Sequence, residues 1–118
     1  MPRTAVEVLT DHLKALNAHD VEAILADYAP DAVLVTPGAT LQGHDGLRQA
    51  FGGLLEQMPN CVFTEKSVTE ATAGADGVLL LEWSLESDVA TVSDGIDTVV
   101  VRDGLIVAQT ARFTPEPR

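Results

Sequence analysis

Alternation of apolar and polar side chains in one segment is the strongest constraint on how this chain folds. Between Val78 and Glu86 the odd positions are Leu79, Leu81, Trp83 and Leu85, whereas the even positions include Glu82, Ser84 and Glu86. Because successive side chains of a strand point to opposite faces, this pattern predicts a β-strand with its odd face buried. Further strands are expected at residues 61–72, 95–102 and 105–113, and Asp103-Gly104 predicts a tight hairpin turn between the last two.

The N-terminal half has helical spacing instead. One helix is predicted from the apolar stripe formed by Ala5, Leu9, His12, Leu13 and Leu16. Thr4 is expected to cap it, with Glu7 as the capping-box partner. Asp20 is expected to cap a second short helix, which carries Ile24, Leu25 and Tyr28 and is followed by a turn at residues 29–31.

The remaining segments complete the expected order of elements. Residues 32–36 and 40–42 predict a hairpin around Pro37-Gly38, and a third helix is expected to end at Met58 because a proline follows. Residues 88–94 are polar and predict a loop. Residues 114–118 are expected to form a flexible tail.

Helices followed by antiparallel strands indicate an α+β fold in one domain, residues 1–118. Strands of this length with one apolar face are expected to curl around the helices as a half-barrel with an interior cleft. With 46% apolar residues, the chain is expected to fold, and its formal net charge of −11 argues against binding to nucleic acid or to anionic membrane surfaces. No signal peptide or membrane-spanning run is evident, and the single cysteine, Cys61, is compatible with a reducing cytoplasm.

Asp97 and His12 are the candidate catalytic residues. Asp97 lies in an otherwise apolar strand on the same face as Val99, where an ionised carboxylate is costly unless it is paired or neutralised. His12 lies within the apolar stripe of the first helix. Both residues also have purely structural interpretations: the carboxylate could tie a strand to a loop or face solvent, and the imidazole could be a core side chain bound to a carbonyl or to Tyr28.

The same inward faces predict the walls of a ligand pocket. Trp83 could stack on a flat ligand, and Thr36 could hydrogen-bond to it. The other expected wall residues, equally consistent with plain core packing, are Phe51, Leu81, Val99 and Phe113. No metal site is expected, because no spacing of histidine and carboxylate ligands resembles one, and no cofactor is expected.

The order of elements resembles the NTF2-like superfamily, in its ketosteroid isomerase-like and SnoaL-like branch. The resemblance covers roughly residues 6–113 and rests on four stretches: Leu16-Asn17-Ala18-His19-Asp20 with Ile24-Leu25, Tyr28-Ala29-Pro30-Asp31-Ala32, Gly43-His44-Asp45-Gly46-Leu47-Arg48, and Val101-Arg102-Asp103-Gly104-Leu105-Ile106. It implies a cone-shaped α+β half-barrel with a pocket between sheet and helices. Many members are homodimers, and members include isomerases, polyketide cyclases, dehydratases and non-catalytic binding domains, so the fold does not determine the function.

Steroid isomerases of this superfamily have three catalytic positions, and this chain has the same residue type at only one of them. The resemblance places Asp97 at a neutral aspartic acid that donates a hydrogen bond, His12 at a tyrosine donor, and Thr36 at the aspartate base. A threonine cannot replace a carboxylate as a base at neutral pH, so a standard steroid isomerase is not expected.

Two main functional hypotheses follow. The first is a cofactor-independent isomerase, cyclase or dehydratase that moves protons on a small apolar, oxygen-bearing molecule. The second is a non-catalytic ligand-binding or dimerisation module; a transport or scaffolding adaptor is a third, weaker alternative. A homodimer is expected through the second face of the sheet, where Ile96, Val100 and Ile106 are apolar yet out of phase with the buried face.

Overall fold

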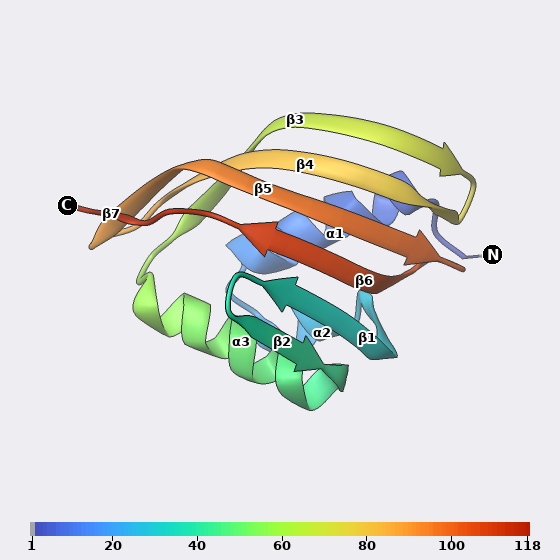
Figure 1. Cartoon of the computed structure of the whole chain (residues 1–118), viewed down its shortest axis with the longest axis horizontal. Helices are drawn as coiled ribbons and strands as arrows, with labels where there is room; N and C mark the ends of the chain where they lie inside the picture. Colours follow the sequence, from blue (N-terminus) through green and yellow to red (C-terminus); the bar gives the residue numbers. More distant parts are fainter. Residues whose placement is uncertain (1) are drawn as a thin grey trace.

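A computed structural model describes residues 2–118, which form three helices against one curved sheet. In chain order the elements are α1 (Ala5–Asn17), α2 (Val21–Leu25), β1 (Tyr28–Thr36), β2 (Ala39–Gln42), α3 (Gly43–Gln57), β3 (Val62–Ala73), β4 (Asp76–Glu86), β5 (Ala90–Arg102), β6 (Leu105–Arg112) and β7 (Glu116–Pro117). The sheet order is β2-β1-β6-β5-β4-β3, with β7 paired to β5 (Figure 1). The predicted α+β half-barrel is confirmed.

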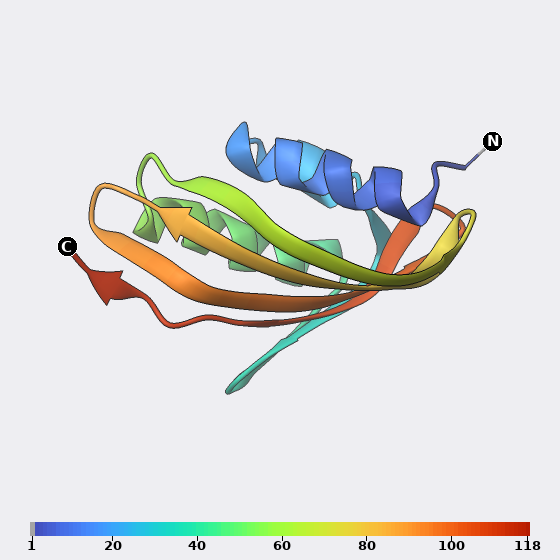
Figure 2. The same ribbon diagram turned by 90° about the horizontal axis from the view of Figure 1, so that it is seen from above.

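The helices cover one side of the sheet, which curves around them (Figure 2). β1 pairs with β6 in parallel, and the other neighbours are antiparallel. The register shifts between Trp83 and Leu85 where β4 meets β5, and between Glu65 and Ser67 where β3 meets β4. Such irregularities bend strands, and here they accompany the concave face that holds the helices.

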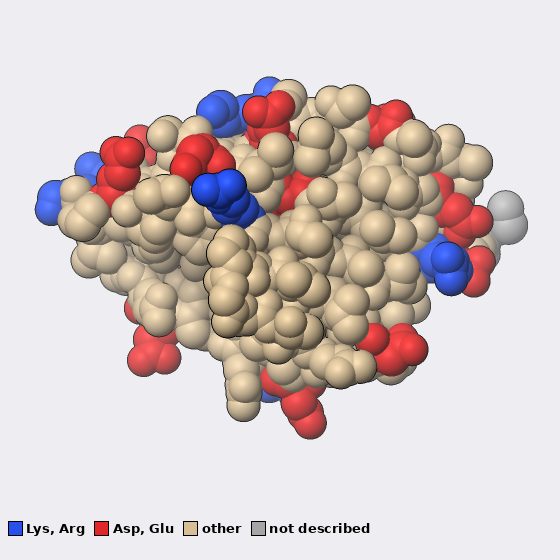
Figure 3. Space-filling view, in the orientation of Figure 1, with Lys and Arg blue, Asp and Glu red and all other residues tan. Residues whose placement is uncertain are grey.

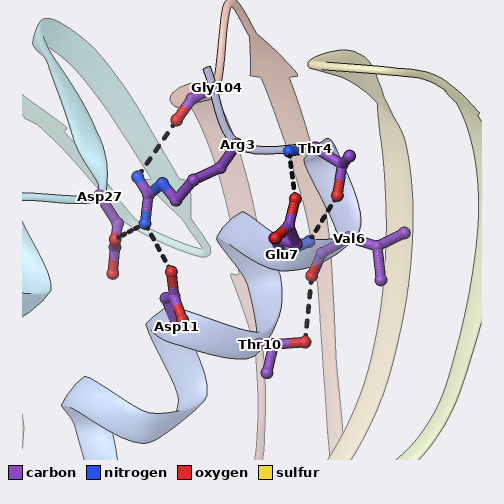
Figure 4. Close-up of polar contacts among 8 residues, drawn as sticks. All are labelled: Arg3, Thr4, Val6, Glu7, Thr10, Asp11, Asp27 and Gly104. Carbon is purple, nitrogen blue, oxygen red and sulfur yellow. Dashed lines mark hydrogen bonds and ion pairs between the residues drawn. The ribbon is translucent and has the colours of Figure 1, made fainter. Parts of the chain in front are cut away.

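Local sequence signals locate α1 and β4 correctly. Thr4 caps α1 as expected, because its side chain accepts from the Glu7 amide while the Glu7 carboxylate accepts from the Thr4 amide (Figure 4). In β4 the odd residues 79, 81, 83 and 85 are buried, as the alternation predicts. Asp103 and Gly104 both have positive φ, of 52° and 76°, which is the backbone geometry of the predicted two-residue hairpin turn.

Arg3 ties the N-terminal segment to α1, to the residue before β1 and to the turn between β5 and β6 (Figure 4). Its guanidinium donates to Asp27 at 2.6 Å, to Asp11 at 3.0 Å and to the Gly104 carbonyl at 3.2 Å. Asp27 is only 5% exposed, so its carboxylate depends on this partner. The ion pair therefore connects α1, the start of β1 and the turn between β5 and β6.

Three local predictions differ from the structure. Tyr28 begins β1 rather than ending α2, and residues 29–31 belong to that strand rather than to a turn. β5 begins at Ala90, inside the predicted loop. Within the segment expected to be a flexible tail, Glu116 and Pro117 form β7 and pair with Thr91 and Ala90. In each case pairing with a distant strand extends a segment whose own composition is not strand-like.

Candidate functional site

A cavity of about 590 Å³ lies between the concave face of the sheet and helices α1 and α3. Its walls are mainly apolar side chains, among them Leu13, Leu16, Leu34, Leu54, Met58 and Phe63. The charged or titratable side chains that line it, among residues 2–118, are His12, Asp97 and Arg112. A largely apolar cavity of this size with a few polar groups has the usual character of a small-molecule site.

Asp97 lies in the middle of β5 and is 8% exposed. Its Oδ1 accepts a hydrogen bond of 3.0 Å from the Trp83 indole, and its Oδ2 accepts one of 2.8 Å from the Gln109 amide. Burial is the largest influence and raises the pKa of Asp97 to about 6, against the lowering effect of these two hydrogen bonds. The carboxyl group is therefore held firmly and has a pKa near neutrality.

His12 reaches the same cavity from α1 and is 1% exposed. Its Nδ1 is buried and has no hydrogen-bond partner among the described residues. The ring meets Tyr28 and Phe51 edge-on, with centroid distances of 5.6 and 5.9 Å. Burial lowers the pKa of His12 to about 4, so the imidazole is neutral at pH 7, with one nitrogen as donor and the other as acceptor.

Gln109 was not expected at this site from the sequence, and Tyr28 was expected there only as a possible structural partner of His12. Both are buried, at 4% and 2% exposure, and the Tyr28 hydroxyl donates to the Gln109 side-chain oxygen. Gln109 has the same strand parity as the inward-facing Ala111, so the period of two alone could have placed it on the concave face. Tyr28 could not be placed, because its assignment to a helix rested on local spacing that the pairing of β1 with β6 overrides.

Trp83 forms part of one aromatic wall. Its ring lies 5.4 Å from the centroids of both Phe63 and Phe113. Across the sheet Trp83 is the register partner of Gly95, and its indole covers the position where a β-carbon would be at that glycine. The wall can contact a flat ligand while the indole nitrogen binds Asp97.

The structure brings most of the residues suggested by sequence to this cavity. His12, Thr36, Phe51, Leu81, Trp83, Asp97 and Phe113 line it. Val99 does not, and it is fully buried in the core. It lies two residues beyond Asp97 on the same face of β5, where its side chain belongs to the hydrophobic core.

His12 and Asp97 are not joined by a direct hydrogen bond in the described chain. Asp97 is bound by Trp83 and Gln109, so the two candidate catalytic residues share a cavity without contacting each other through a hydrogen bond. Among residues 2–118 no three histidine, cysteine or acidic side chains converge as metal ligands would. The arrangement offers a carboxyl group and a neutral imidazole to a molecule bound between them.

Comparisons with solved structures agree on the fold. A cystatin-like protein of unknown function from Nostoc punctiforme is 17% identical, with 98% of this chain and 97% of that chain covered and a TM-score of 0.75. An NTF2-like protein of unknown function from Burkholderia xenovorans is 20% identical, with 93% and 82% covered and a TM-score of 0.73. A protein from Kribbella flavida assigned provisionally as a ketosteroid isomerase is 16% identical, with 92% and 76% covered and a TM-score of 0.73.

These likenesses show an NTF2-like fold and no more. No curated protein sequence matches the chain significantly. No described helix is long and apolar enough to cross a membrane. The model of the SnoaL-like domain matches residues 9–109, which includes His12, Asp97 and every strand from β1 to β5, and the chain therefore belongs to the SnoaL-like domain family.

Proposed function

We propose that the protein is an enzyme that moves a proton on a small, largely apolar, oxygen-bearing molecule, with its own side chains as acid and base. The observation that supports this most is the convergence of His12 and Asp97 on one apolar cavity, where burial lowers the pKa of the first and raises that of the second. Titratable groups whose pKa values are strongly shifted by their surroundings within a cleft are typical of acid–base sites.

In this proposal Asp97 is the general base. A carboxylate with a pKa of about 6 is ionised at pH 7 yet basic enough to accept a proton, which is the compromise that favours general-base catalysis. It takes a proton from a carbon next to a carbonyl group, and the electron pair moves onto the carbonyl oxygen. Returning the same proton to another carbon completes an isomerisation, and returning it to a departing hydroxyl group completes a dehydration.

His12 is the hydrogen-bond donor to the developing oxyanion. Because its pKa of about 4 keeps it neutral, the imidazole stabilises negative charge by donating a hydrogen bond rather than by a positive charge. Thr36, which lines the cavity where the resemblance places a base, is left as a hydrogen-bonding wall residue.

The experiment is the isomerisation of a cyclic β,γ-unsaturated ketone, followed by the absorbance of the conjugated product and by deuterium uptake in D₂O. We expect a rate above buffer that rises with pH through about 6, where Asp97 ionises, and falls by about 10²-fold or more in Asp97→Asn. Thr98→Val, one residue away on the opposite face of β5, is the control and should keep the rate. Equal rates in wild type and Asp97→Asn would contradict the assignment of the base.

A second function, ligand binding without catalysis, is favoured by one observation. Both oxygens of Asp97 already accept hydrogen bonds from the protein, as expected of a structural carboxylate. In that case the same ketones, or saturated analogues, would raise the melting temperature of the protein without isomerisation or deuterium uptake. The two functions are thus separated by one set of compounds.

We also propose that a second copy of the chain docks on the convex face of the sheet. Figure 3 looks onto this face and shows a broad area of uncharged side chains, with charged residues mostly toward its rim. Val35, Leu80 and Ile96 are 37–43% exposed, and with a net charge of −11 an uncharged face is where two copies repel each other least. Ile106, expected on this face, is instead fully buried, because the register shift between Val100 and Val101 turns it inward.

Light scattering at high micromolar concentration tests the dimer. We expect twice the chain mass of 12.5 kDa, and dissociation when Ile96→Asp places a charge on the convex face. Val62→Asp, an equally apolar and more exposed site at the far edge of the sheet, is the matched control and should remain dimeric. A monomer mass for the wild type would refute this proposal.

A further inference from the structure

Gln109 joins Asp97 to Tyr28 through a buried hydrogen-bond system at the wall of the cavity. It lies on β6, diagonally across from Asp97, since Val99 is its register partner on β5. Its amide nitrogen donates to Asp97, and its oxygen accepts from the Tyr28 hydroxyl on β1. Three strands therefore contribute to one chain of hydrogen bonds in a place closed to solvent.

We propose that Gln109 is a positioning residue, which with Tyr28 fixes the orientation of Asp97 and favours its ionised form. The inference depends on the directions of the hydrogen bonds. An ionised carboxylate only accepts, so the Gln109 amide must turn its NH₂ group toward Asp97 and its oxygen toward the donor, Tyr28. Burial and the negative charge of Asp97 raise the pKa of the Tyr28 hydroxyl well above its usual value, so it stays protonated and remains that donor.

Protonated Asp97 fits this arrangement poorly. The Trp83 indole can only donate, so an Asp97 hydroxyl facing either protein partner would meet another donor unless Gln109 reversed its amide. Reversal would make the Tyr28 oxygen accept from an NH₂ group, and the hydroxyl proton would lose the Gln109 oxygen as its acceptor. The arrangement therefore opposes the burial that raises the Asp97 pKa, and an added proton is directed to the lone pairs that face the cavity.

In the proposed function, on which this step rests, the preference for ionised Asp97 also affects catalysis. A base must also give its proton back, and two donors that disfavour protonated Asp97 make it a better acid in the second half of the reaction. Gln109 would thus limit how basic Asp97 becomes. The other titratable groups around the cavity, among the described residues, are His12 from α1 and Arg112 from β6, and Tyr28 adjoins Gln109 from β1.

Trp83 makes the inference testable without any ligand or activity. It is the only tryptophan of the chain, and its indole N–H is bound to Asp97, so the ¹H–¹⁵N resonance of that group should report the ionisation of Asp97. In wild type we expect a pH transition centred near 6, which Asp97→Asn abolishes. Loss of a hydrogen bond to a charged group should raise the midpoint by about 1 to 2 pH units in Gln109→Met. Tyr28→Phe, which keeps the ring and frees the amide to reverse, should raise it by less.

Gln49→Met is the matched control, because Gln49 lines the same cavity without a hydrogen bond to Asp97 among those of the described residues. Its midpoint should equal that of the wild type. The inference is overturned if Gln109→Met and Gln49→Met titrate alike, or if the wild-type resonance shows no transition. If Gln109→Met does not fold, the midpoint of Tyr28→Phe decides, and an unchanged value overturns the inference. A normal titration together with no isomerisation of ketones would refute the enzyme and leave the positioning role intact.

Discussion

Adding one methyl group at Gly95 should dislodge Trp83 from the candidate site. Gly95 is buried in β5 directly under the indole, and a β-carbon there would lie well inside van der Waals contact of three indole ring carbons. Its φ is not in the left-handed region, so the effect of Gly95→Ala would come from this clash and not from backbone strain. Since neighbouring rings of Phe63 and Phe113 hold Trp83 in place, the indole has to tilt away from Asp97.

Two effects of Gly95→Ala lower the free energy of unfolding, and one raises it. Overpacking costs about 1–3 kcal/mol. The lost hydrogen bond to Asp97 costs about 1.5–3 kcal/mol, whereas alanine reduces the entropy of the unfolded chain and returns about 0.4–1 kcal/mol. The free energy of unfolding should therefore fall by roughly 3 kcal/mol.

Urea unfolding followed by the fluorescence of Trp83, the only tryptophan, measures both effects together. We expect a lower midpoint and a changed emission from the folded state. Gly52→Ala is the control, because Gly52 lies in α3 with nothing within 4 Å of its added methyl group. That change should stabilise the helix by about 0.5–1 kcal/mol. Wild-type stability and unchanged emission in Gly95→Ala would refute the placement of the indole over Gly95.

Three further predictions concern charge and polar contacts. Between about pH 6.5 and 4, the buried and neutral His12 makes the free energy of unfolding fall on acidification, whereas Asp97, whose pKa is raised from 3.8 to about 6, makes it rise. Asp97→Asn removes the second effect, so the loss of stability in acid should become larger by on the order of 2–3 kcal/mol. Urea unfolding at each pH measures this loss. Arg3→Met leaves its buried carboxylate partner unpaired and should cost about 3 kcal/mol, whereas Arg48→Met, which breaks an exposed pair, should change stability by less than about 1 kcal/mol; equal losses would contradict this reasoning. Asn17→Ala removes two hydrogen bonds to the main chain of β3, at 2.7 and 3.1 Å, and should cost about 2 kcal/mol in the same assay, so an unchanged midpoint would show that water replaces them.

Local patterns determined the elements whose evidence lies within a few residues. The capping box of α1 and the alternation of β4 require only neighbouring side chains, and both occur as predicted. The same periods put His12 and Asp97 on inward faces, so these two residues of the candidate site could be found from sequence. These are properties of a single helix or strand, and they do not depend on what packs against it.

Tertiary structure decided everything that depends on how distant segments meet. The chain from Tyr28 through Gln109 to Asp97 exists because β1 pairs in parallel with β6, a connection that no local period encodes. A register shift buries Ile106, and a cross-strand partnership places Trp83 over Gly95. A period fixes the face on which a side chain lies, but strand order and register fix its neighbours, and hydrogen bonds and pKa values depend on those neighbours.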